Sequence, residues 1–182
     1  MKLKSLYLPA YFIFLTNTSI IQATPLKPCD YVINIDHVLI RCARPQDADQ
    51  LLPLMQQLIG YPQSLKSLED RLVTYLTSPQ YHVFVAEVDN VLVGLVAVYV
   101  THRFIVHGKR CTIEALVVDE LCRGHGVGRK LMHTVELFAK NSGCSLIDLV
   151  TGIQRTEAHL FYQKMGYRHA GQQEKLYFTK KV

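Results

Sequence analysis

The sequence lacks the cysteine pattern of a structural zinc site or of a disulfide framework. The number of cysteines is odd, and no Cys-x-x-Cys pair occurs among Cys29, Cys42, Cys111, Cys122 and Cys144. A disulfide framework needs paired cysteines, and a zinc site needs closely spaced ones. We therefore expect most of these thiols to be unpaired and buried as small apolar groups, without a catalytic role.

The sequence also lacks the histidine spacing of a helical metal site and the long basic run of a nucleic-acid arm. None of the eight histidines forms a His-x-x-x-His pair, so no bound metal is expected. The net charge of +5 is mildly basic and suits an anionic ligand. Without a run of lysines and arginines, nucleic acid is not expected as a partner.

Neither an internal repeat nor a strongly polar composition is present. Of the 182 residues, 49% are hydrophobic and 19% are charged. This composition is typical of a folded chain rather than a disordered one. The length predicts one well-buried domain.

The first 36 residues are set apart from this domain. Lys2 and Lys4 precede an apolar stretch at residues 6–15, and Ala23 offers a cleavage point, as in a secretory signal peptide. The stretch is too short to span a bilayer, so no stable membrane span is expected. We interpret residues 1–36 as a signal-like or disordered N-terminal extension, and residues 37–182 as the domain.

Hydrophobic spacing predicts strands and helices in alternation along the domain. Asp89 and Asn90 separate two β-rich runs and predict a hairpin, while Asp47 and Gln50 have the spacing of a helix capping box. The expected strands are 37–43, 81–88, 91–100, 111–119, 144–152 and 167–179, and the expected helices are 47–58, 64–78, 126–141 and 156–165. Direct and helical connections both occur. We therefore expect an α/β (α+β) fold with a mixed sheet covered by helices.

The segment RGHGVGRKL, residues 123–131, joins an expected strand to an expected helix. A helix start presents unpaired amides and a positive dipole, and glycines let an anion approach the backbone. The segment therefore predicts a phosphate or pyrophosphate cradle. It matches neither Gly-x-x-x-x-Gly-Lys-Ser/Thr nor Gly-x-Gly-x-x-Gly, because Arg129 occupies a glycine position of both patterns.

A third pattern fits. Arg123, Gly126 and Gly128 match Arg/Gln-x-x-Gly-x-Gly/Ala, and RTEAHLFYQKMGY follows about 25 residues later. Both segments resemble the signatures of the GNAT superfamily, the GCN5-related N-acetyltransferases, and the resemblance covers about residues 37–182. It implies the acyl-CoA N-acyltransferase fold, with a mostly antiparallel sheet and splayed middle strands. It also implies direct acetyl transfer from acetyl-CoA to an amine in a ternary complex.

The resemblance implies a role for each cofactor-binding position. The backbone of Leu116, Val117 and Val118 is expected to bind pantetheine as an added strand would. The pyrophosphate is expected on the loop amides of Arg123, Gly124, His125, Gly126, Val127, Gly128 and Arg129. Arg155 is expected either near the phosphate end of the cofactor or in solvent. Tyr162 is expected to donate a proton to the departing thiolate, with ordinary helix packing as the alternative.

Glu114 is the candidate general base. It interrupts an otherwise apolar strand, and strand alternation places it on the same face as Leu116 and Val118, half-buried. A carboxylate there can accept the proton of an attacking ammonium group. A structural salt bridge is the alternative.

The acceptor amine is expected beside the first two helices and the turn after the hairpin, at Tyr61, Tyr99, His102, Arg103 and His107.

A second interpretation of the function is a non-catalytic acyl-CoA sensor or a partner-binding module. The intact glycine loop and Tyr162 favour the enzyme. Acetyl-CoA and unpaired cysteines favour a cytoplasmic location over the signal-like start, and a homodimer is left open.

Overall fold

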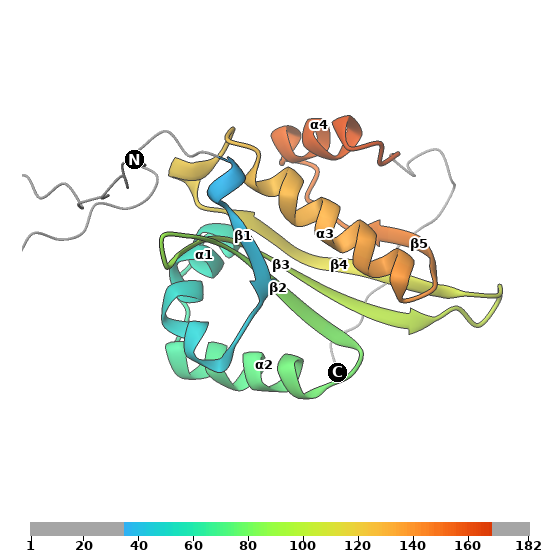
Figure 1. Ribbon diagram of the computed structural model, residues 1–182, viewed down its shortest axis with the longest axis horizontal. Coiled ribbons are helices and arrows are strands. Elements are labelled where there is room, and N and C mark those ends of the chain that lie inside the picture. Colours follow the sequence, from blue (N-terminus) through green and yellow to red (C-terminus); the bar gives the residue numbers. More distant parts are fainter. Residues whose placement is uncertain (1–34, 169–182) are drawn as a thin grey trace, which may run out of the picture.

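The computed structural model describes residues 35–168 (Figure 1). The helices and strands alternate as the sequence predicts. In chain order they are β1 (Leu39–Cys42), α1 (Ala48–Ile59), α2 (Leu65–Thr77), β2 (Tyr81–Val88), β3 (Val91–His102), β4 (Lys109–Val118), α3 (Val127–Asn141), β5 (Cys144–Leu149) and α4 (Thr156–Lys164). Short 3₁₀ turns occupy Ile35–His37, Pro45–Asp47 and Glu120–Cys122. Nearly all of the strand expected at 167–179 and nearly all of the expected extension lie outside the described residues; residues 167 and 168, which are described, are not in a strand.

The five strands form one sheet in the order β1-β2-β3-β4-β5. The first four pair antiparallel, and β5 runs parallel to β4. The helices α1 and α2 cover one face, while α3 packs on the other, with α4 beside it (Figure 1). This confirms the expected mixed, mostly antiparallel sheet with helices on both faces.

Two hydrophobic clusters hold the layers together. On the α3 face, fully buried Leu131, Met132 and Val135 pack against strand residues such as Val96. On the other face, Leu51 and Leu54 of α1 pack against strand residues such as Val85 and Leu95. Successive side chains of β2 and β3 point to opposite faces of the sheet, and both faces are buried. This explains why the sequence of these two strands is nearly continuously apolar.

The β2–β3 hairpin turns at Asp89 and Asn90, whose φ angles are +48° and +65°. These values are those of a turn whose twist matches antiparallel strands, and the predicted hairpin is confirmed. Gln50 of α1 fixes the turn: its Oε1 accepts from the Leu92 amide at 2.9 Å, and its Nε2 donates to the Asn90 carbonyl at 3.3 Å. The capping box expected between Asp47 and Gln50 is therefore wrong, because Gln50 is committed to the hairpin.

Asp47 is the only charged or polar residue that is buried in the described part of the chain, at 4% exposure. Its carboxylate accepts two hydrogen bonds from Arg41, at 2.7 and 2.9 Å, and one from the Arg44 amide at 2.7 Å. Arg41 also donates its Nε–H to Glu87 of β2 at 2.6 Å. Burial works to raise the pKa of Asp47, but these donors outweigh it and hold the pKa below its ordinary value.

The cysteines agree with the sequence only in part. Cys42, Cys111 and Cys144 carry free thiols, and burial raises the pKa of the Cys111 thiol to about 12. Such a group is inert at neutral pH, as expected. Cys122 is fully buried and disulfide-bonded, so the expectation of an unpaired thiol is wrong at this position.

Candidate active site

The strands β4 and β5 pair along only part of their length. Their register runs from Lys109↔Cys144 to Ile113↔Leu149, and no pairing follows. Beyond that point, Leu116 and Val118 of β4 remain paired with β3 alone. Within residues 35–168, the β4 edge that faces away from β3 therefore has backbone groups without a neighbouring strand, and the expected splay between the middle strands is confirmed.

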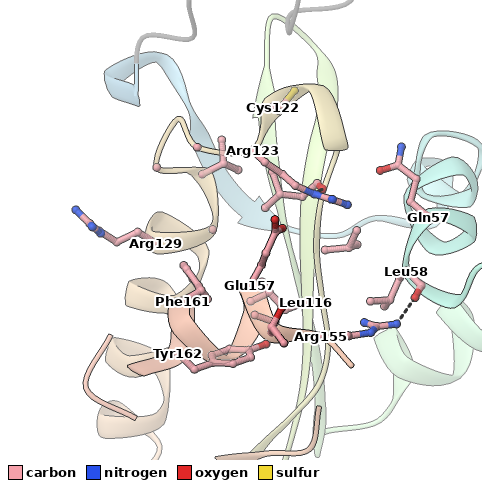
Figure 2. Close-up of a pocket in the computed structure, with 18 of the residues that line it drawn as sticks. Gln57, Leu58, Leu116, Cys122, Arg123, Arg129, Arg155, Glu157, Phe161 and Tyr162 are labelled. Carbon is pink, nitrogen blue, oxygen red and sulfur yellow. Dashed lines mark hydrogen bonds between the residues drawn. The ribbon is translucent and has the colours of Figure 1, made fainter. Parts of the chain in front are cut away.

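A cleft of about 810 Å³ opens at this splay (Figure 2). Its size is that of a site for a sizeable organic ligand. The walls are the end of β4, the glycine loop, the start of α3, the start of α4 and the end of α1. The lining residues are Gln57, Leu58, Leu116, Val117, Val118, Cys122, Arg123, Gly124, Gly126, Val127, Gly128, Arg129, Gln154, Arg155, Thr156, Glu157, Ala158, Phe161 and Tyr162. All but one of the cofactor-binding positions expected from the sequence are brought together here; the exception is His125, which is exposed.

The glycine loop ends at the start of α3, as predicted. Gly126 is the N-cap, with φ of +85°, and Gly124 has φ of +82°. Both values favour glycine, because a side chain would strain the backbone. The unpaired amides of the first turn and the helix dipole make this end of the cleft suited to an anion.

Gly128 has a different role. It lies inside α3, and a Cβ there would stand 3.4 Å from the Phe161 ring of α4 and 3.6 Å from Val118 of β4. A methyl group would fit in ordinary contact, whereas a longer side chain would have to enter the cleft between α3 and α4. Glycine at 128 therefore keeps the space open.

The basic residues of the loop are not equivalent. Arg123 donates its Nε–H to the Val118 carbonyl at 3.1 Å, so its side chain folds over the end of β4. In Figure 2 the Arg129 side chain points away from the wall of the cleft that α1 forms. Lys130 is turned toward the start of β1, where its Nζ donates to the Val38 carbonyl at 2.7 Å. Arg123 is thus the basic side chain of the loop that folds over this end of the cleft.

Tyr162 lies at the opposite end of the cleft from the loop (Figure 2). Its ring packs edge-on against Phe161, with 5.3 Å between centroids. Burial raises the pKa of the Tyr162 hydroxyl, and the charge of Arg155 offsets this only in part. The hydroxyl therefore keeps its proton at neutral pH and is able to donate it.

Arg155 crosses the cleft instead of reaching the loop. Its Nη2 donates to the Leu58 carbonyl at the end of α1, at 2.5 Å, a partner 97 residues away in sequence (Figure 2). The side chain thus joins the start of α4 to the end of α1. The side chain is exposed, as in the second position considered from the sequence, and it lies near Tyr162 rather than near the loop.

Glu114 is placed differently from the prediction. Ala97 of β3 pairs with Ala115, and Val98 pairs with Ile113, so Glu114 is the extra residue of a β-bulge. The bulge interrupts the alternation: Leu116 and Val118 pack on the α3 face, whereas Glu114 accepts a hydrogen bond from the Tyr75 hydroxyl of α2. Glu114 is also exposed. The expected common face with Leu116 and Val118 and the expected half-burial are both wrong.

The surroundings of Glu114 are aromatic. The ring centroids of Tyr75 and Tyr81 lie 4.5 Å apart, and those of Tyr81 and Tyr99 lie 5.9 Å apart. Burial and the neighbouring Glu114 carboxylate raise the pKa of Tyr75, which keeps its hydroxyl a donor. Of the acceptor positions expected from the sequence, Tyr99 belongs to this cluster. Tyr61 is exposed, and the turn residues His102, Arg103 and His107 do not line the cleft.

Gln57 and Glu157 are two of the lining residues that the sequence did not predict. Gln57 of α1 donates to Asp119 at 3.3 Å and accepts from the Glu120 amide at 3.1 Å, which ties α1 to the segment before the glycine loop. Glu157 is the one carboxylate among the described residues that line the cleft. Its position one turn before Phe161 on α4 is a signal that could have identified it.

Comparison with known proteins agrees with this geometry. Residues 49–167 match the family model described as the acetyltransferase (GNAT) family. An aminoalkylphosphonate N-acetyltransferase of Salmonella typhimurium is 29% identical over 133 residues, which cover 72% of this chain and 85% of that protein. Human N-acetyltransferase 8 is 31% identical over 105 residues, or 58% of this chain and 46% of that protein.

The fold itself is matched by solved structures. An aminoglycoside N-acetyltransferase in complex with CoA superimposes with a TM-score of 0.69. The match covers 80% of this chain and 95% of that one, at 21% sequence identity. At that identity the match supports the fold alone.

Proposed function

Because the chain belongs to the acetyltransferase (GNAT) family and thus transfers an acetyl group to an amine, we propose that acetyl-CoA is its donor and binds in the cleft between β4 and α4. The observation that carries this proposal is the splay of β4 from β5 after Ile113, directly beside the start of α3. An extended chain of amides and a diphosphate need these two features side by side.

The lining residues fit this donor. The open edge of β4 at Leu116 to Val118 suits the pantetheine amides, and the amides from Arg123 to Arg129 suit the pyrophosphate. Gly128 supports the assignment, since its missing side chain leaves the space between α3 and α4 open. When bound, acetyl-CoA supplies a thioester carbonyl and a thiolate leaving group.

Tyr162 is the proposed general acid. Its hydroxyl lines the end of the cleft away from the pyrophosphate loop, where the sulfur end of an extended cofactor would lie. The raised pKa of Tyr162 keeps the proton on its oxygen until it is donated to a developing thiolate.

Glu114 is the proposed general base on the acceptor side of the sheet. The bulge turns its carboxylate toward α2, and the Tyr75 hydroxyl holds one of its oxygens. An exposed carboxylate beside aromatic rings suits a cationic amine, which must lose a proton before it attacks. Glu157 is the competing carboxylate, since it lies in the cleft itself.

The donor site is tested by calorimetric titration of the purified protein with acetyl-CoA. Gly128→Glu places a carboxylate in the cleft at a helical position where glycine is not required by the backbone, so it should fold and should lose binding. The matched control is Leu137→Glu, which adds the same charge on an exposed position of the same helix and should bind like the wild type. Equal binding by Gly128→Glu, or no binding by a folded wild type, would contradict the proposed site.

A further inference from the structure

The turn between β3 and β4 presents three consecutive apolar side chains to solvent. Phe104 is fully exposed, Ile105 is 93% exposed and Val106 is 42% exposed. The strands pair up to His102↔Lys109, and the Arg103 amide donates to the Gly108 carbonyl at 3.1 Å, which closes the turn. In Figure 1 this hairpin projects beyond the rest of the sheet, at the end away from the start of α3.

Neither the fold nor the donor site accounts for this turn. Its apolar residues belong to neither core cluster, and none of them lines the cleft. Lys109 and Leu116 are seven positions apart along β4, which is roughly 20 Å along an extended strand. A cluster of exposed apolar side chains on a projecting tip indicates a contact with something outside the chain.

The charged side chains nearest the tip in the sequence are all basic. No aspartate or glutamate occurs between residues 91 and 113, whereas five basic residues flank the apolar tip: His102, Arg103, His107, Lys109 and Arg110. Arg110 forms an ion pair with Asp148 of β5, at 3.4 Å, and both side chains are partly exposed. The tip therefore combines an apolar point with a basic collar.

A hollow lies beside the collar. It has a volume of about 370 Å³ and is lined by Pro79, Gln80, Val100, Thr101, His102 and Lys109. Two of its lining residues, His102 and Lys109, are basic. A phosphate-bearing headgroup would meet both charge and space here.

We propose that the β3–β4 turn docks on an anionic lipid surface, with Phe104, Ile105 and Val106 entering the interface and the basic collar contacting the headgroups. An apolar point below a ring of basic side chains is the arrangement that binds such a surface, since apolar burial and charge attraction act together. Contact between the tips of two copies of this chain is disfavoured, because it would bring two basic collars together.

The absence of tryptophan from the sequence makes a direct test possible. Phe104→Trp introduces a single tryptophan at the tip, and Leu137→Trp introduces one on the outer surface of α3 as the matched control. Each protein is mixed with vesicles of phosphatidylcholine alone and of phosphatidylcholine with phosphatidylglycerol. A probe placed at the tip is needed, because vesicle sedimentation does not distinguish binding by the turn from binding by the apolar stretch at residues 6–15.

The proposal expects a blue shift of the Phe104→Trp emission with the anionic vesicles and none with Leu137→Trp. Added salt should weaken the shift, because screening reduces the attraction of the collar. For a second test, Val106→Trp serves as the fluorescent probe. In that chain, replacing Phe104 and Ile105 together by serine should lower the fraction of protein bound through the tip by about tenfold. Unchanged acetyl-CoA binding would show that the doubly substituted protein is folded.

Three outcomes would overturn the proposal. The first is an unchanged Phe104→Trp emission with both vesicle types. The second is an equal shift with neutral and anionic vesicles. The third is a shift that does not depend on vesicles. If it grows with protein concentration, the turn serves self-association, and if it needs a short RNA, the turn binds nucleic acid.

Discussion

The hydroxyl of Tyr75 in α2 donates a hydrogen bond to the carboxylate of Glu114 in β4, across 39 residues of sequence. The contact is possible because the bulge at Glu114 turns its side chain to the α2 face. Tyr75 in turn packs on Tyr81, so the carboxylate is held by a side chain that is itself fixed. The pair is the feature that orients the proposed base.

Replacing Glu114 tests the base directly. Glu114→Gln should lower kcat/KM by about a hundredfold. The loss should be largest at low pH, where the amine is hardest to deprotonate, and acetyl-CoA affinity should not change. Tyr75→Phe should give a smaller loss of kcat, because the carboxylate remains but is less well oriented. The measurement is kcat/KM against pH for both variants.

Glu157→Gln is the matched comparison for Glu114→Gln, since Glu157 lines the cleft. If Glu157→Gln removes the low-pH activity and Glu114→Gln does not, the base is Glu157. A flat response of both variants across pH would leave neither carboxylate as the base.

Replacing Tyr162 tests the acid. Tyr162→Phe should lower kcat by about a hundredfold, because the thiolate leaves without a proton donor. The affinity for acetyl-CoA should stay within about twofold, since the ring and its packing on Phe161 remain. In the wild type, burial raises the pKa of Tyr162, so kcat should not fall through ionisation of this residue below about pH 10. An unchanged kcat in Tyr162→Phe would remove the acid role.

Arg155 should matter for binding rather than for chemistry. Arg155→Ala removes the bond to the Leu58 carbonyl that joins α4 to α1 across the cleft. Acetyl-CoA affinity should fall by about threefold to tenfold, because one exposed charged hydrogen bond that positions the wall is lost. Calorimetry measures this change. Arg110→Ala, which removes a solvent-exposed ion pair with Asp148, is the control and should bind normally. Equal affinities of the two variants would contradict this role.

The Arg41–Asp47 pair should stabilise the fold. Asp47→Ala leaves a half-buried guanidinium without its main partner and should lower the free energy of unfolding by about 3 kcal/mol. Asp70→Ala removes an exposed pair with Lys66 and should leave the free energy of unfolding almost unchanged. Denaturant unfolding of both variants measures the difference.

The same pair has a defined pH dependence. Because the folded state holds the pKa of Asp47 below its ordinary value, the stabilisation is present above about pH 4 and is lost as the pH falls through the folded pKa. The difference in the free energy of unfolding between wild type and Asp47→Ala should therefore disappear in acid. A difference that is constant from neutral pH to acid would contradict this.

The sequence by itself determined the elements and the glycine loop, because these depend on neighbours in the chain. The hairpin at Asp89 and Asn90 follows from residues that accept a positive φ. The start of α3 at Gly126 and the helix carrying Tyr162 follow from local spacing. The anion-binding end of the cleft could be predicted for the same reason.

Only the tertiary structure decided what crosses between elements. The face of the sheet on which the Glu114 side chain lies depends on a bulge against β3, which strand alternation does not reveal. The partner of Arg155 lies on α1, 97 residues away, and Glu157 lines the cleft only because α4 packs beside α3. The exposure of Phe104 and Ile105 likewise depends on how far their hairpin extends beyond the sheet. These features arise from long-range packing, which local residue patterns do not specify.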